Sequence, residues 1–351
     1  MAYSTITKPG LHFNTKLYTG NGSTNNITGV GFQPDWVWIK DRTNANSHRL
    51  SDSVRGATKY LISSASNAEA TEAAGLTAFD SDGFSLGSNS DFNGNSANLV
   101  AWNWKANGAG SANTAGSINS TVSLNSTAGF SIVKYTGDGS TGSTVGHGLN
   151  AVPDMYITKN RSYAYAWGVY HKDIANDKGL FLSDASAETT GTGFRNSTAP
   201  TSSLFTLGGG SQPYRYTSNK SGDEYIGYFF KSVKGYSKIG KYIGSGNANG
   251  PLINTGFKPA WVIIKRTDST GGWEIYDSKR DGFNPQVHGL TANTNNAEDN
   301  TDDLVDILSN GFKIRHDGSG LNASNGTYIY AAFAEEPLVA NVGNGIPATA
   351  R

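Results

Sequence analysis

Two short motifs combine residue types that can bind an ion or a phosphate group. Residues 80–83 (Asp-Ser-Asp-Gly) imitate part of a calcium-binding loop, but with Gly83 at the sixth position the first ligand position falls on Ala78 and the twelfth on Asn89. Neither residue supplies the carboxylate that such a loop needs, so the motif favours a hairpin turn. The Gly-rich stretch 244–250 lacks the strand and the helix that flank a nucleotide-binding loop, and it predicts another turn.

Residues suited to catalysis are present without the spacing that catalysis needs. The chain has no cysteine, and none of its six histidines has the His-x-x-x-His spacing that places two rings on one helix face. No Gly-x-Ser-x-Gly elbow presents a nucleophilic serine, and carboxylate pairs for glycoside cleavage can be chosen only arbitrarily. The sequence therefore predicts a protein that is not an enzyme, with no catalytic residue, cofactor or metal. A hydrolase or capsule depolymerase assembled from distant loops stays an alternative.

Aromatic residues are the best candidates for recognition. One group occupies hydrophobic segments with alternating rings, which suits either a sugar-stacking platform or a core, and we predict core positions for Trp104, Phe230 and Phe333. A second group lies in divergent stretches, where loops carry recognition. We expect this second group to form a contact surface, with packing in a satellite core as the alternative. It consists of Tyr163, Tyr165, Trp167, Tyr214 and Tyr216.

The elements that position these residues recur three times along the chain. Tyr18, Tyr135 and Tyr242 each end a short segment and are followed, after one residue, by a Gly-rich turn. A Gly-Phe-x-Pro-x-Trp-Val-x-Ile-Lys segment follows at 31–40 and again at 256–265, with a looser copy in the middle unit. Each unit then closes with an aromatic segment. Such self-similarity predicts three copies of one unit of about 100 residues.

Hydrophobic residues in these segments alternate with a period of two, which is the period of a β-strand. Trp36 and Trp38 share one face and Val37 and Ile39 share the other, so we expect this strand to be covered on both sides. Units of this size with many strands and turns have the dimensions of a β-sandwich or jelly roll. Helical periodicity is confined to two short stretches, 65–74 and 302–308.

The order of these landmarks sets the expected domain boundaries. We predict sandwich repeats at 10–107, 128–235 and 236–336. The Gly/Ser/Asn-rich stretch 108–127 is expected to be a flexible linker or an extended run along a neighbour, and 337–351 a flexible tail.

The amino-acid composition argues against two classes of partner, nucleic acids and membranes. Glycine supplies 44 of 351 residues, as expected of a chain rich in turns, and charged residues only 16%. The 28 basic and 28 acidic residues give a formal net charge of zero, whereas a protein that grips nucleic acid carries a basic surplus. No apolar run approaches the roughly 18 residues that a membrane span requires. We therefore expect neither nucleic-acid binding nor membrane insertion.

Four segments of the first unit together carry a resemblance to a known family. They are 31–40, 48–56, 75–87 and 100–105. They resemble a repeat domain of unassigned function that is common in virion proteins of tailed bacteriophages from marine bacteria. The match is close over 10–107 and weaker in the two later units, where the Val-Arg-Gly of 54–56 has drifted. The resemblance implies a concanavalin-like sandwich in each repeat and a structural role in the virion.

We therefore expect a non-enzymatic bacteriophage virion protein, either a tail-fibre-like surface appendage or a receptor-binding module that contacts glycans or proteins of the host envelope. The alternative is a capsid or tail decoration protein that clamps neighbouring subunits. The expected partners are other virion proteins and the host surface, and the expected location is the virion, after synthesis in the host cytoplasm. Self-association is also expected, because virion proteins occur as symmetric sets.

Overall fold

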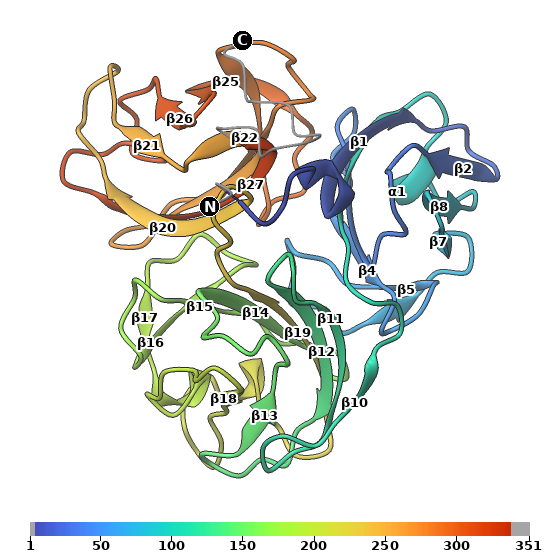
Figure 1. The fold of residues 1–351 in the computed structure, drawn as a ribbon, viewed down its shortest axis with the longest axis vertical. Helices are drawn as coiled ribbons and strands as arrows, with labels where there is room; N and C mark the ends of the chain where they lie inside the picture. Colours follow the sequence, from blue (N-terminus) through green and yellow to red (C-terminus); the bar gives the residue numbers. More distant parts are fainter. Residues whose placement is uncertain (1–3, 338–351) are drawn as a thin grey trace.

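The computed structural model describes residues 4–337, apart from the side chains of 299–303. Strands make up nearly all of the regular structure in this part of the chain, so the prediction of an all-β protein is confirmed. Figure 1 shows three lobes around a common centre. We call 10–107 unit 1, 128–235 unit 2 and 236–336 unit 3. The helices are short and comprise η1 (Pro9–Leu11), α1 (Ser90–Asn93), η2 (Thr192–Phe194) and η3 (Arg215–Thr217).

Each unit contains four antiparallel strands in the same order, which we call its inner sheet. In unit 1 the order is β1 (Phe13–Thr19), β9 (Asn98–Trp104), β3 (Trp36–Asp41) and β4 (Arg49–Asp52). In unit 2 it is β12 (Phe130–Thr136), β19 (Glu224–Phe230), β14 (Met155–Asn160) and β15 (Gly168–His171). In unit 3 it is β20 (Ser237–Ile243), β27 (Thr327–Pro337), β22 (Phe257–Arg266) and β23 (Trp273–Asp277). The first strand of each unit therefore pairs with its last.

A second, outer layer of strands covers one face of each inner sheet. Its strands are β2 (Asn25–Thr28), β8 (Gly83–Leu86) and β7 (Leu76–Asp80) in unit 1, β13 (Thr144–Gly146) and β18 (Leu204–Thr206) in unit 2, and β21 (Leu252–Asn254), β26 (Gly311–Ile314) and β25 (Asp299–Leu308) in unit 3. Each unit buries its own hydrophobic cluster between the two layers. The remaining strands are β5 (Lys59–Tyr60), β6 (Ala70–Thr71), β10 (Ser111–Asn113), β11 (Ser120–Asn125), β16 (Lys178–Phe181), β17 (Thr189–Thr190) and β24 (Gln286–Thr291).

The recurring tyrosine has the same role in all three units. The hydroxyl groups of Tyr18, Tyr135 and Tyr242 donate hydrogen bonds to the carbonyl oxygens of Phe92, Ser218 and Leu321, at 2.7, 2.8 and 2.7 Å. In each case the residue after that carbonyl is a fully buried asparagine, and its side-chain oxygen accepts a backbone N–H of the Gly-rich turn. The asparagines are Asn93, Asn219 and Asn322. Each unit thus closes one end of its sandwich with the same tyrosine, turn and asparagine.

The other faces of the three inner sheets meet in one shared core of aromatic and branched side chains. Trp104 lies 4.4 Å from Trp36 of its own unit and 5.4 Å from Trp261 of unit 3, measured between ring centroids. Trp36 also stacks on Tyr228 of unit 2, at 4.3 Å. Trp104, Phe230 and Phe333 are buried in this core, as predicted. Because β3 faces the sandwich on one side and the shared core on the other, both of its faces are apolar.

Three buried lysines join the units into a closed ring. Lys159 of unit 2 donates to the carbonyl oxygen of Ser66 in unit 1 (3.2 Å). Lys265 of unit 3 donates likewise to Ala185 in unit 2 (3.3 Å), and Lys40 of unit 1 to Asn295 in unit 3 (3.4 Å). Each ammonium also bonds the carbonyl of the next residue in its own chain segment, at 2.6 to 2.7 Å. These lysines are the last residues of the recurring hydrophobic segment.

A second set of hydrogen bonds runs around the ring in the same direction. The indole N–H groups of Trp167 and Trp273 donate to the carbonyl oxygens of Ile62 and Phe181 in the preceding unit, at 2.7 and 2.8 Å. His48 takes the equivalent place in unit 1, where its Nε2 lies 3.2 Å from the carbonyl oxygen of Thr291 in unit 3. The ring therefore closes between the first and last units without a covalent link.

Three segments add detail to the expectations or differ from them. Of the two alternatives for 108–127, the extended run along a neighbour fits the structure, because this stretch contributes β10 and β11 to the sheet of unit 2. Ile118, Val122 and Leu124 pack against the core of that unit. The expected helix at 302–308 is part of β25, which pairs with β26. Residues 65–74 form turns and β6, since the Glu69 N–H bonds Arg161 across the contact with unit 2. Of the expected tail, all but Pro337 lies outside the described residues.

Truncation of Trp104 tests the shared core. We expect Trp104→Ala to lower the free energy of unfolding by about 3–5 kcal/mol, because it opens a cavity where two units meet. Chemical denaturation monitored by circular dichroism measures this change. Phe283→Ala removes a ring that is 69% exposed, and it is expected to change stability by no more than about 0.5 kcal/mol. A similarly small effect of Trp104→Ala would contradict the shared core.

The pH dependence of stability tests the buried lysines. Burial lowers the pKa of Lys159 to about 7, below its ordinary value of 10.5. Between these values the unfolded chain binds more protons than the folded one, so stability attributable to Lys159 increases as pH rises from about 7 to about 10. We expect Lys159→Met to flatten the slope of unfolding free energy against pH by up to about 1.4 kcal/mol per pH unit. Parallel slopes for the two proteins would contradict a pKa of Lys159 that is lowered by burial.

Candidate contact surface

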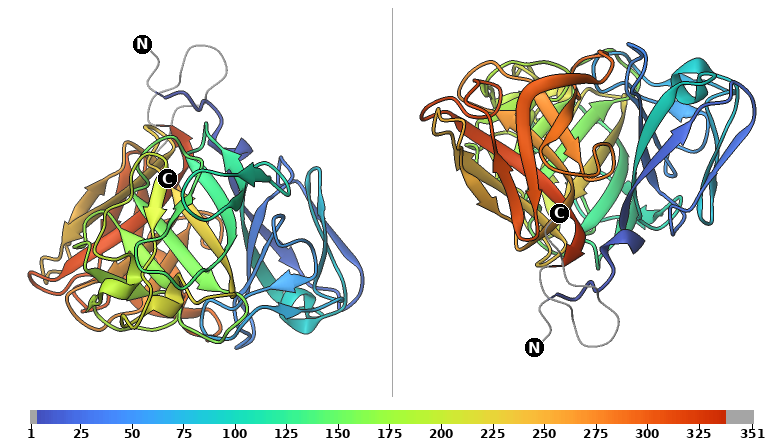
Figure 2. Two further views of the ribbon diagram at one scale, coloured as in Figure 1. Left: turned by 90° about the horizontal axis from the view of Figure 1, so that it is seen from below. Right: turned by 90° about the horizontal axis from the view of Figure 1, so that it is seen from above.

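The antiparallel strands give the molecule two distinct ends. Phe13 pairs with Trp104 at one end of the unit 1 inner sheet, and Thr19 pairs with Asn98 at the other. The first described residues and the end of β27, at 334–336, lie together at the Phe13 end, which we call the terminal end. The opposite end, which we call the loop end, carries the Gly-rich turns. Figure 2 shows the molecule from the side, with η1 and the start of β1 at the terminal end.

Three tyrosines and two cationic side chains form a cluster at the loop end of unit 2. Tyr163 and Tyr165 lie in the loop after β14, and both meet Tyr216 of η3 edge to face, at 6.0 and 5.5 Å between ring centroids. The Lys220 ammonium lies 4.1 Å from the Tyr163 centroid, and the Arg215 guanidinium lies 4.3 Å from the Tyr216 centroid. We call these five residues the tyrosine surface.

The buried side chains of Asn160 and Tyr225 fix the positions of the two segments that contain the tyrosines. The side-chain oxygen of Asn160, at the end of β14, accepts the backbone N–H groups of Ser162 and Tyr163 at 3.0 and 2.8 Å, which makes a tight turn. Its amide nitrogen donates to the Tyr225 hydroxyl at 2.9 Å. That hydroxyl donates in turn to the carbonyl of Tyr216 at 3.3 Å. One hydrogen-bond network therefore fixes both segments before any partner binds.

The tyrosine surface has the chemistry of a recognition patch. Tyr163 is 45% exposed, while Tyr165 and Tyr216 are half-buried. Burial raises the pKa of Tyr165 above its ordinary value. A tyrosine hydroxyl is protonated at neutral pH and can donate a hydrogen bond. Tyrosine rings supply apolar contact area with few rotatable bonds, and their hydroxyls add hydrogen bonds. Cation–π contacts of Lys220 with Tyr163 and of Arg215 with Tyr216 stabilise the orientation of these rings. The arrangement suits contact with a glycan or a protein.

Two of the five expected contact residues lie elsewhere. Trp167 is fully buried in the shared core, so its prediction as a surface residue is wrong. The physical reason is its ring-closing hydrogen bond to Ile62, which draws the indole into the contact between units. Tyr214 stacks on Phe194 at 5.1 Å and lies 5.4 Å from Phe181, in a satellite cluster beside the tyrosine surface.

The tyrosine surface is a feature of unit 2 that the equivalent loops of units 1 and 3 do not share. In unit 1 the side chain of Asp41 makes the same turn as Asn160, because it accepts the N–H groups of Thr43 and Asn44 at 2.8 and 2.9 Å. The corresponding loops, 41–47 and 266–272, contain no aromatic residue. Units 1 and 2 share this turn, and of the three loops only that of unit 2 displays tyrosines.

The calcium-like motif is a hairpin, as predicted. Asp80 pairs with Gly83 across a two-residue turn between β7 and β8. The Asp82 carboxylate accepts the N–H groups of Gly29 and Gly31 at 2.9 and 2.7 Å, and these bonds lower its pKa. Among the described side chains, those of 4–298 and 304–337, no group of three or more histidine or acidic residues is placed to hold a metal ion. No helix within residues 4–337 has the length and apolar character for crossing a membrane.

Paired substitutions separate the exposed tyrosines from the buried tryptophan. We expect Tyr163→Ala to change the free energy of unfolding by less than about 0.5 kcal/mol, because the side chain is 45% exposed and lies outside the hydrophobic cores. Trp167→Ala is expected to lower it by about 3–5 kcal/mol. Thermal and denaturant unfolding of both variants measure the difference. Equal effects would mean that Tyr163 is a structural residue and not a free contact residue.

Comparison with known families matches residues 8–337 to a family described as a domain of unknown function (DUF7483). No match was found among the curated proteins or among the solved structures. One family model spans all three units, in agreement with the core that they share. The chain belongs to the DUF7483 family.

Proposed function

We propose that the protein is a non-enzymatic structural component of a bacteriophage virion. In this role it is a tail-fibre-like surface appendage or receptor-binding module, and its tyrosine surface contacts a glycan or protein of the host envelope. The proposal rests mainly on the placement of two features at opposite ends of the molecule. Both described chain ends lie at the terminal end, and the tyrosine surface lies at the loop end. An appendage needs this separation between attachment and contact. The resemblance of 10–107 to phage virion repeats supports the same role.

We also propose that each unit is a copy of one concanavalin-like sandwich. Support comes from the common order of the inner strands and from the equivalent tyrosine, asparagine and lysine contacts in all three units. Triplication within one chain supplies a threefold arrangement like the one that a cyclic trimer obtains from three subunits. Other virion proteins are the proposed partners at the terminal end, and symmetric sets of this chain the proposed assembly.

Binding to host cells and to a glycan array tests the function. We expect the combined variant Tyr163→Ala/Tyr216→Ala to bind host cells at least about tenfold more weakly, because exposed tyrosines are typical anchors of a contact surface. Fluorescently labelled protein and flow cytometry provide the measurement. Phe283→Ala, which removes an exposed ring from unit 3, is the matched control and should bind normally.

Two results would contradict the proposal. Host binding that is unchanged in the tyrosine variant would remove the role of this surface. Absence of any binding to host cells or glycans, together with cross-links from the protein to a capsid or tail subunit in purified particles, would favour the decoration role instead.

A further inference from the structure

The tyrosine surface contains an arginine whose charge no carboxylate balances. Arg215 lies in η3 and forms no ion pair within the part of the chain that the structure describes. Every other arginine in that part pairs with an aspartate or a glutamate, except Arg195, which is 1% exposed and donates to backbone carbonyls instead. Arg215 is only half-buried. Among the described arginines it is therefore the one that brings an unbalanced charge to the surface.

The Arg215 guanidinium is held in place by its own segment. Its carbon lies 4.3 Å from the Tyr216 ring centroid. Its two terminal nitrogens donate to the Gln212 carbonyl oxygen at 3.1 Å and to the Tyr216 hydroxyl at 2.8 Å. A guanidinium has five N–H donors in a planar fork, and these two bonds use only part of it. None of the nitrogen atoms of Arg215 is both buried and unbonded, so the remaining donors face solvent.

The other charged groups around these rings already have partners. The Lys220 ammonium lies 3.2 Å from the Asp223 carboxylate. Glu224, at the start of β19, lies 3.3 Å from Arg161. The surface therefore has one cation in excess, at Arg215. An anionic group is the ligand that such a site attracts, because a hydrogen bond between two charged groups is stronger than one between neutral groups.

Arg215 is present in unit 2 only, as the tyrosines are. It lies four residues before the buried asparagine that binds the Gly-rich turn. The positions four residues before the equivalent asparagines of units 1 and 3 hold Asn89 and Gly318. Two of the three units thus fold with another residue here, so the shared scaffold does not require an arginine. The arginine and the tyrosines are features of the same surface.

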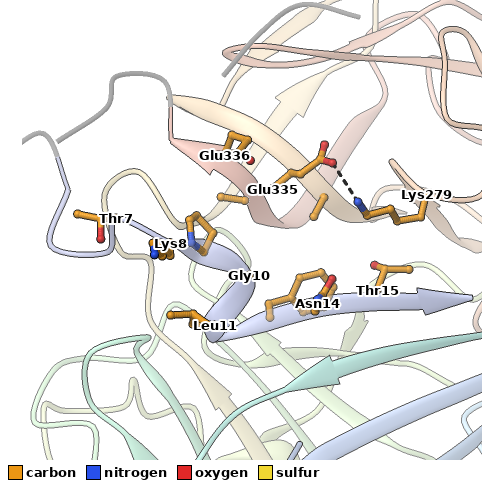
Figure 3. A pocket seen from close by; sticks show the side chains of 13 residues that line it. Thr7, Lys8, Gly10, Leu11, Asn14, Thr15, Lys279, Glu335 and Glu336 are labelled. Atoms are coloured by element: carbon orange, nitrogen blue, oxygen red, sulfur yellow. Dashed lines mark hydrogen bonds and ion pairs between the residues drawn. The ribbon is translucent and has the colours of Figure 1, made fainter. Parts of the chain in front are cut away.

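The pocket at the terminal end has no such excess of positive charge. Figure 3 shows this pocket between η1 and the end of β27, where Lys279 lies 3.4 Å from Glu335. The other charged residues of its lining are Lys8 and Glu336, so lysines and glutamates occur there in equal number. The tyrosine surface is therefore better suited to an anionic ligand than this pocket is.

The rest of the tyrosine surface suits a ligand rich in hydroxyl groups. Tyr163 is 45% exposed, and the large aliphatic side chains that are exposed lie in other segments of the described chain. The centre of a protein interface is normally apolar and depleted of charged residues. Each tyrosine instead offers a small apolar ring surface and a hydroxyl, which match the C–H groups and the hydroxyls of a sugar ring. An anionic glycan therefore fits this surface better than an acidic protein segment does.

We propose that the tyrosine surface binds a glycan that carries carboxylate groups, as chains of uronic acid residues do. The free donors of Arg215 bond the carboxylate, whose planar shape matches the guanidinium fork. The exposed parts of Tyr163 and Tyr165 pack against the sugar rings. This inference rests on the proposed function, because it names the class of ligand for the same surface.

Binding to defined polysaccharides tests the ligand class without altering the protein. The probes are two biotinylated polyuronates, polygalacturonate and alginate, each captured on a sensor surface. We expect surface plasmon resonance to show saturable binding of the full chain to at least one of them. Conversion of the carboxylates of that polymer to methyl esters removes the charge that Arg215 bonds, and it should weaken binding at least about tenfold. Neutral dextran should not bind.

Substitution of Arg215 tests the residue itself. Arg215→Gln should weaken polyuronate binding at least about tenfold. Arg215→Lys keeps the charge but lacks the planar fork, so it should recover only part of the binding. The matched control is Arg315→Gln, which removes the same charge from a side chain that is 49% exposed and paired with Asp306. This control should bind as the natural chain does, and thermal unfolding of each variant shows whether it is folded.

Four results would overturn the proposal. One is the absence of saturable binding to either polyuronate. Another is binding that is equally strong after methyl esterification, an outcome that does not depend on the folding of any variant. The third is an equal effect of Arg215→Gln and Arg315→Gln, because net charge alone would then explain the binding. The fourth is stronger binding to polyglutamate or to dextran sulfate, which would identify an acidic peptide or a sulfated glycan as the ligand.

Binding to host cells separates this inference from the proposed function. If Tyr163→Ala/Tyr216→Ala reduces binding to host cells and Arg215→Gln does not, the carboxylate ligand is wrong and contact with the host stands. If the natural chain binds a polyuronate through Arg215 but binds no host cell, the proposed function is wrong and the glycan site stands.

Discussion

Burial of large rings from three sheets in one shared core is the interaction on which this protein depends. Each inner sheet has two apolar faces, and its outer layer covers only one of them. An isolated unit would leave Trp36, Trp38, Trp102 and Trp104, or their counterparts, in water. Burial of such side chains stabilises by roughly 1.5–3 kcal/mol each. We therefore expect the three units to fold cooperatively as one domain, although the sequence consists of three similar units.

Hydrogen bonds fix the order and orientation of the units around that core. Lys159 and Trp167 of unit 2 both reach carbonyl oxygens of unit 1, and the same direction is kept around the ring. Desolvation of three ammonium groups works against stability, yet each finds carbonyl partners on both sides of a contact. This closed scaffold leaves the loops free to differ. Unit 2 uses that freedom to display tyrosines.

The sequence predicted features that depend on local pattern. Strand alternation indicated the all-β class, and the recurring tyrosine marked equivalent positions, because its hydroxyl makes the same bond in each unit. Contacts between units were not predictable, because nothing local distinguishes Trp167, which turns inward, from Tyr163, which stays exposed. The role of Lys40 as a ring-closing donor was missed for the same reason, although its recurrence at the end of each hydrophobic segment was visible. The pairing of 120–125 with β12 prevailed over a composition typical of linkers.

Unfolding followed separately in each unit tests the central claim most directly. Single cysteines can be placed at exposed positions of units 1, 2 and 3, because the chain has none of its own, and labelled with an environment-sensitive dye. A shared core predicts that the three labels report one denaturant midpoint and one slope, since no unit can unfold without exposing the rings of the other two. Three separate midpoints, or a unit that stays folded after its neighbours have unfolded, would contradict the account.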